Sequence, residues 1–109
     1  MVLVDIPFLR FGKNDIARPW LPTTIVNPHS GKQADIYGLI DTGADECALP
    51  ATYAYAHTVQ LKIKGLKTRR TLIDFLPNLQ VPLLGMKNFL ANFILTIDYP
   101  RSRFSLQKQ

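Results

Sequence analysis

The sequence is short of the features that mark secreted and membrane-bound proteins. Its single cysteine, Cys47, cannot form a disulfide within the chain, so nothing in it indicates an oxidising compartment. No stretch approaches the roughly 20 consecutive apolar residues that a membrane-spanning helix needs. Residues Met1 to Asp5 place no basic group ahead of their apolar run, unlike a secretory signal. These absences predict a cytoplasmic protein with no membrane partner.

Acidic residues are also few. Eight Asp and Glu stand against 13 Lys and Arg, which gives a formal net charge of +5. Such a balance can attract polyanions. The basic residues are scattered, however, apart from one group formed by Lys62, Lys64, Lys67, Arg69 and Arg70. Lys62 and Lys64 alternate with apolar residues, as on the solvated face of a strand, and no aromatic side chains are interleaved with the group, as they are in single-strand binders. We therefore expect no nucleic-acid partner, and a basic β-barrel that binds nucleic acid is the less favoured alternative.

The chain does have enough apolar residues for one core. It contains 109 residues, 47% of them hydrophobic, and its mass of 12.3 kDa matches the common size of a single domain. Eight prolines and six glycines are spread along it and break it into short pieces. Such punctuation favours strands over helices. Residues 1–109 are therefore predicted to form one all-β domain.

Short apolar and β-branched runs, separated by turn-forming residues, predict the individual strands. Residues 23–40 are expected to form a hairpin, and residues 93–106 a second one. Strict alternation predicts a strand at 58–64. The other predicted strands are 2–11, 71–75 and 79–84, and one short helix is predicted at 86–91.

The segment that carries chemistry begins at an apolar strand that ends in Asp41, Thr42 and Gly43. A carboxylate at the end of a buried strand needs a reason to be there, because burying an unpaired charge is costly. A glycine two residues later lets the backbone turn sharply without a Cβ, so its amide can face the carboxylate. The plain structural alternative is a turn that ends the strand with an Asx-type hydrogen bond.

Other reactive residues have no partner at a useful spacing. His29 lies in a polar turn and His57 at a strand start, and neither has metal-ligand spacing to Cys47. No histidine is placed to orient a serine or cysteine nucleophile, and there is no glycine-rich phosphate loop. We expect Cys47 to be a small buried hydrophobe, and we expect no metal ion or cofactor.

The frame around Asp41 resembles the retropepsin-like aspartic proteases of bacteria and retroelements. The similarity rests on residues 39–45, on Leu84 and Gly85 leading into a short helix, and on the closing hairpin, and it covers roughly residues 19–106. It implies a retropepsin-like closed β-barrel half with one short C-terminal helix. It also implies an aspartic endopeptidase, which hydrolyses peptide bonds with a water activated by two carboxylates.

In this family each Asp-Thr-Gly copy supplies half of the site, and this chain has one copy. The resemblance therefore implies a homodimer with both Asp41 side chains at its twofold axis. It makes Asp41, Thr42 and Gly43 the catalytic residues. The Thr42 hydroxyl would reach across the axis to the other chain, and the Gly43 amide would steady the carboxylates.

The residues after the motif are implied in substrate binding. By position, Ala44 and Asp45 would contact the backbone of a peptide or protein substrate. In the family, the carboxylate at the position of Asp45 also pairs with a basic residue of the C-terminal helix, for which Lys87 is the counterpart here. The plain alternative is an exposed ion pair of the kind that contributes little.

One element of the family is missing between Asp41 and Gly85. Such proteases close over substrate with a β-hairpin flap, which needs about 12–17 residues. The chain has no spare segment of that length, and the junction near Ala56–His57 reads as a deletion. Either the natural protein carries a flap that this sequence omits, or it has none and encloses substrate poorly. An intact mass of 12.3 kDa would exclude the first explanation. The second favours the alternative function, a weakly active or inactive dimeric peptide-binding module.

Overall fold

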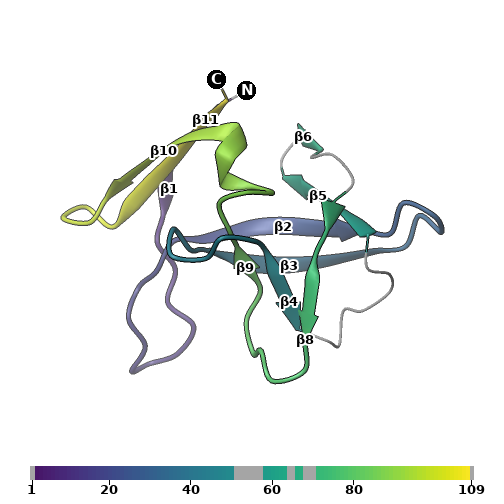
Figure 1. The fold of residues 1–109 in the computed structure, drawn as a ribbon. Coiled ribbons are helices and arrows are strands. Elements are labelled where there is room, and N and C mark those ends of the chain that lie inside the picture. Colours follow the sequence, from purple (N-terminus) through teal and green to yellow (C-terminus); the bar gives the residue numbers. More distant parts are fainter. Residues whose placement is uncertain (1, 51–57, 64–65, 68–70, 109) are drawn as a thin grey trace.

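The computed structural model describes residues 2–50, 58–63, 66–67 and 71–108, and these are built almost wholly of strands (Figure 1). They form eleven strands and one 3-10 helix. In chain order the elements are β1 (Val2–Pro7), β2 (Trp20–Val26), β3 (Gln33–Ile40), β4 (Ala48–Pro50), β5 (Thr58–Ile63), β6 (Leu66–Lys67), β7 (Thr71–Leu72), β8 (Asp74–Leu76), β9 (Leu83–Leu84), η2 (Leu90–Asn92), β10 (Phe93–Asp98) and β11 (Arg103–Lys108). The all-β prediction is confirmed.

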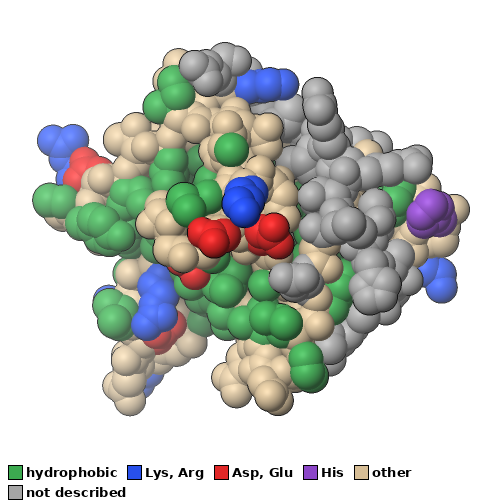
Figure 2. All heavy atoms as spheres, in the orientation of Figure 1, with side chains coloured by type: hydrophobic (Ala, Val, Ile, Leu, Met, Phe, Trp, Pro, Cys, Tyr) green, Lys and Arg blue, Asp and Glu red, His purple; other side chains and the backbone are tan. Residues whose placement is uncertain are grey.

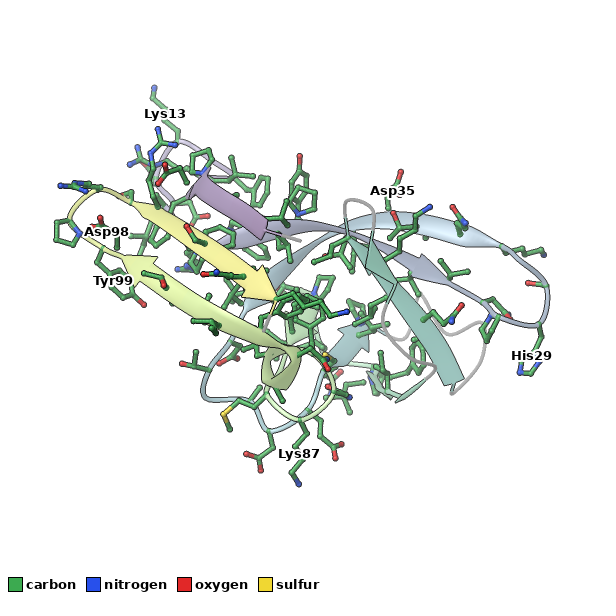
Figure 3. All side chains as sticks on the ribbon, turned by 90° about the horizontal axis from the view of Figure 1, so that it is seen from above. Lys13, His29, Asp35, Lys87, Asp98 and Tyr99 are labelled. Carbon is green, nitrogen blue, oxygen red and sulfur yellow. The ribbon has the colours of Figure 1, made fainter. Side chains whose placement is uncertain are left out.

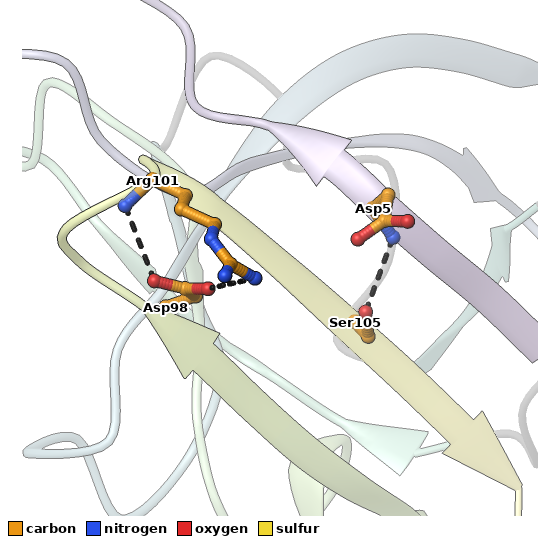
Figure 4. Close-up of polar contacts among 4 residues, drawn as sticks. All are labelled: Asp5, Asp98, Arg101 and Ser105. Carbon is orange, nitrogen blue, oxygen red and sulfur yellow. Dashed lines mark hydrogen bonds and ion pairs between the residues drawn. The ribbon is translucent and has the colours of Figure 1, made fainter.

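The smaller sheet joins both ends of the chain in the order β1-β11-β10 (Figure 1). β10 and β11 form the predicted closing hairpin, in which Asp98 lies opposite Arg103. Arg101 closes the turn between them. Its backbone N–H donates to Asp98 Oδ1 at 3.1 Å, and its guanidinium lies 3.6 Å from the same carboxylate (Figure 4).

β1 is irregular at Asp5, where its register on β11 shifts. Asp5 has a φ of 52°, in the left-handed region that few non-glycine residues adopt. Its N–H donates to Ser105 Oγ at 3.1 Å (Figure 4), and its carbonyl accepts from Arg103 at 2.8 Å. These two bonds hold the irregular strand against β11. The strand predicted at 2–11 ends at Pro7.

The larger sheet has the order β6-β5-β2-β3-β9-β4-β8. β2 and β3 form the predicted hairpin, with Trp20 opposite Leu39 and Val26 opposite Gln33. β9 comes much later in the chain but lies between β3 and β4, parallel to β3 and antiparallel to β4. The loop of residues 41–47, which joins β3 to β4, is therefore brought to the C-terminal end of β9.

One hydrophobic cluster spans both sheets. Its buried side chains come from β11 in the smaller sheet, from five strands of the larger sheet, and from η2 and the turn before it. Cys47 and Ile73, which lie just outside strands, complete it. Those that are at most 2% exposed are Leu21, Ile25, Cys47, Leu49, Val59, Leu61, Ile63, Leu84, Phe89, Phe104 and Leu106. The segment that follows β9 is thus anchored in the core through Phe89.

Two predicted elements are shorter than their sequence patterns suggest. The strand predicted at 79–84 is confined to β9, because Pro82 has no N–H to donate to a ladder. The helix predicted at 86–91 is limited to η2, and a turn occupies residues 86–89. In that turn Leu90 N–H donates to Gly85 O at 3.0 Å and Ala91 N–H donates to Met86 O at 2.8 Å. Those bonds span five residues, whereas an α-helix needs four.

Other predictions concern the middle of the chain. The strand predicted at 71–75 is divided at Ile73, which is 4% exposed. The strand predicted at 58–64 is present as β5. The junction near Ala56–His57, and with it the missing flap, lies outside the described residues, as do Lys64, Arg69 and Arg70. Within the described ranges no helix combines the length and apolarity needed to cross a membrane.

Candidate functional site

Asp41 extends the ladder between β3 and β9 by one residue. Leu39 N–H donates to Pro82 O at 2.9 Å, and Asp41 N–H donates to Leu84 O at 3.1 Å. The backbone of Asp41 is therefore held as firmly as a strand residue, while its side chain is half-buried. The position of this carboxylate depends on β9, which lies more than 40 residues further along the chain.

The turn after Asp41 folds back onto the carboxylate. Gly43 N–H donates to Asp41 Oδ1 at 3.0 Å, and Ala44 N–H donates to the Asp41 carbonyl at 3.2 Å. The amide–carboxylate bond predicted from the glycine spacing is confirmed. The other carboxylate oxygen, Oδ2, makes no hydrogen bond to any part of the chain that the structure describes. One oxygen is thus fixed by the protein, and the other is available to a ligand.

The segment after β9 holds the rest of the loop through its backbone. Met86 N–H donates to Ala44 O at 2.9 Å, and Lys87 N–H donates to Asp45 O at 2.7 Å. At Gly85 the two segments come so close that a Cβ would overlap the carbonyl of Glu46. Glycine is needed here for close approach of two backbones, since its φ is not in the left-handed region.

The side chains around this loop are mostly exposed. Thr42, Asp45, Glu46 and Lys87 all face solvent, and Lys87 projects outward from the molecule in Figure 3. Figure 2 shows acidic side chains beside a basic one over the loop between β3 and β4, bordered by hydrophobic side chains. The structure brings Asp45 and Lys87 together through their backbones. Among the described residues, the two ion pairs within 4.0 Å are Arg18–Asp15 and Arg101–Asp98, and neither involves them.

Asn88 takes part in the site although its sequence context does not point to it. Its Oδ1 accepts the backbone N–H of Cys47 at 2.7 Å, across 41 residues of chain. This bond fixes the end of the loop, just before β4. A polar amide in the turn after Gly85 is a weak indication by itself, because asparagine is common in any turn.

Cys47 lies beneath the loop and is fully buried, as predicted. Burial raises the pKa of its thiol from 9.0 to about 11. The Gly85 N–H, which donates to Sγ at 3.3 Å, acts in the opposite direction, and the negative charge of Glu46 adds to the rise. The thiol is therefore protonated at neutral pH, and the protein offers no thiolate nucleophile here.

The folded protein should protect Cys47 from iodoacetamide at neutral pH, and denatured protein should react fully.

The raised pKa of the Cys47 thiol also makes the free energy of unfolding depend on pH. Below pH 9.0, the pKa of an unperturbed thiol, the protonated thiol makes its full contribution to the free energy of unfolding. That contribution is lost as pH rises toward about 11. Chemical denaturation over this range measures the loss. Cys47→Ala is the control, and an equally steep decline in that variant would contradict the assignment.

Across the described residues, no group of three or more His, Cys, Asp and Glu side chains is arranged to hold a metal ion. His57 lies outside the described residues, and His29 is exposed in the β2–β3 turn. The chemistry that this site offers is that of one oriented carboxylate per chain, with one free oxygen and exposed neighbours.

No protein-family model, curated protein or solved structure matches the chain.

Proposed function

We propose that the protein is an aspartic endopeptidase that acts as a homodimer. The observation that carries the proposal is the state of Asp41, whose Oδ1 is held by the Gly43 amide while Oδ2 accepts no hydrogen bond from the described part of the chain. The loop around it is pinned to the segment after β9, so the carboxylate is kept in place without being sequestered. A carboxylate held in this way can orient and deprotonate a water molecule.

Peptide hydrolysis by this route needs a second carboxylate. Two carboxyl groups placed close together cannot both ionise, so the pair shares one proton. The ionised member takes a proton from the attacking water, and the protonated member donates a hydrogen bond to the scissile carbonyl. The chain has one Asp41-Thr42-Gly43 motif, so the second carboxylate would come from a second copy related by a twofold axis.

The neighbouring residues have roles that fit this arrangement. The exposed Thr42 is free to reach a second chain, and Gly43 already holds the carboxylate. Ala44 and Asp45 follow on the same loop and would contact the backbone of a bound peptide. The carbonyls of both residues are occupied by Met86 and Lys87, so contacts to substrate would come from the Asp45 carboxylate and the exposed edge of the loop.

An assay of peptide cleavage by the purified protein between about pH 3 and 8 tests the proposal. Activity should be lost by Asp41→Asn, and specific activity should fall on dilution as the dimer dissociates. Cleavage that persists in Asp41→Asn would refute the proposal.

A dimeric peptide-binding module is the second function that we consider. The short connection between Asp41 and Gly85, which leaves no length for a flap, favours it. In that case the purified protein would bind extended peptides and cleave none of them at any pH in the same range. Equilibrium binding and cleavage, measured with one set of peptides, separate the two functions.

A further inference from the structure

Three aromatic side chains meet at the surface on the β2–β3 hairpin. Phe11 packs against Trp20 and against Tyr37, with ring centroids 5.1 Å apart in both pairs. Phe11 is 50% exposed and Tyr37 is 46% exposed, so both present ring surface to solvent. We call Phe11, Trp20 and Tyr37 the aromatic cluster. Its core residue, Trp20, is only 6% exposed, and its buried Nε1 makes no hydrogen bond to the residues that the structure describes.

The aromatic cluster lies on the same face of β3 as Asp41. Side chains alternate along a strand, and the ladder to β9 continues this alternation to Asp41. Tyr37, Leu39 and Asp41 therefore share one face, with Trp20 directly opposite Leu39 on β2. At about 3.3 Å per residue, Tyr37 lies about 13 Å from Asp41 along the strand.

Beyond the aromatic cluster the surface is hollow. Tyr37 and Pro22, which pair across β2 and β3, also line a cavity of about 580 Å³. Most of its other walls are apolar and include Leu3, Ile6 and Ile63. Its two charged residues, Asp35 and Lys62, have opposite signs. The walls therefore favour an uncharged, apolar group.

We propose that the aromatic cluster and this cavity form a subsite for an apolar side chain of an extended peptide. That side chain lies four residues away from the scissile peptide bond, which is placed at Asp41. The placement of the peptide along this face rests on the proposed function. An extended peptide advances by the same rise per residue as β3, so its fourth residue from Asp41 reaches Tyr37.

Trp20 is the only tryptophan of the chain, so its fluorescence reports binding at the aromatic cluster without a label. The probes are two capped octapeptides that differ only at their first and last positions, which are both Leu in one and both Ser in the other. Because a symmetric dimer would carry one cluster on each side, both ends are changed together. Affinities are measured with Asp41→Asn protein, so that no probe is consumed.

We expect the Leu peptide to shift the emission of Trp20 and to bind about tenfold more tightly than the Ser peptide. Tyr37→Ala and Phe11→Ala should each remove most of that preference. Both side chains are half-exposed, so folding should survive their loss. Ile94→Ala, which truncates a 50% exposed side chain on β10, is the matched control and should bind as the parent does.

Equal affinity of the two peptides, or a preference unchanged in both Tyr37→Ala and Phe11→Ala, would overturn the subsite. Failure of the proposed function has a different readout, which is cleavage of the two peptides by wild-type protein. If that protein shows the cluster-dependent preference but cleaves neither peptide, the subsite is retained and the protein is not a protease.

Discussion

Asp41→Asn is expected to lower kcat/KM for peptide cleavage by at least about 10³-fold, because an amide cannot act as the general base. The substitution keeps the shape of the side chain, and the Gly43 N–H can still donate to its oxygen. Stability and dimerisation should therefore be nearly unchanged. Steady-state kinetics with a chromogenic peptide, together with sedimentation of the dimer, measure both. Residual activity near the wild-type level would show that Asp41 is not part of the catalytic machinery.

Mixing wild-type and Asp41→Asn chains tests the requirement for two carboxylates. A mixed dimer holds only one, so it should be inactive. With equal amounts of the two chains, random assembly leaves about a quarter of the dimers with both carboxylates. Activity should therefore fall to about a quarter of that of the same total amount of wild-type protein. Activity that falls only in proportion to the wild-type fraction would show that each chain works alone.

Gly85→Ala is expected to lower the free energy of unfolding by about 3 kcal/mol or more. A Cβ at this position would overlap the carbonyl carbon and oxygen of Glu46 and would lie 2.9 Å from the nitrogen of Cys47. All three are backbone atoms, which cannot rotate away as a side chain can. The loop would have to move off β9, and the bonds that hold Ala44 and Asp45 would be strained with it. Urea denaturation measures the loss.

Gly38→Ala is the matched control for this prediction. A Cβ there would lie 2.8 Å from Leu84, but its contacts are with the side chain, which can adjust. The loss of stability should be smaller than for Gly85→Ala. Gly43→Ala, where a Cβ would lie 3.3 Å from Asp41 Oδ1, should affect activity more than stability. Equal destabilisation by Gly38→Ala and Gly85→Ala would show that the close approach of the backbones is not what requires glycine.

Local patterns were enough to predict the two hairpins. β2 with β3 and β10 with β11 are each joined by a few turn-forming residues, so strand alternation and turn chemistry specify the pairing. The helix predicted at 86–91 failed for the opposite reason. Its residues suit a helix, but Leu90 and Ala91 donate five residues back rather than four, while backbone bonds to the distant loop of residues 41–47 hold the start of the segment.

The contacts of the candidate site also divide into local ones, which the sequence predicts, and distant ones, which it does not. The sequence predicts the bond between the Gly43 amide and the Asp41 carboxylate, because the two groups are only two residues apart. It does not predict that Asn88 holds the backbone of Cys47, since 41 residues separate them. Nor does it predict that Phe11 reaches Tyr37, which requires the loop before β2 to fold over the hairpin.

The sequence by itself therefore determined the strand-rich character, both hairpins and the turn in which the Gly43 amide faces the Asp41 carboxylate. All of these depend on backbone preferences and on neighbours a few residues away. Only the tertiary structure decided that β9 lies between β3 and β4, and that Gly85 meets Glu46. Those contacts join distant segments, and they are selected by burial of one shared core rather than by any local pattern.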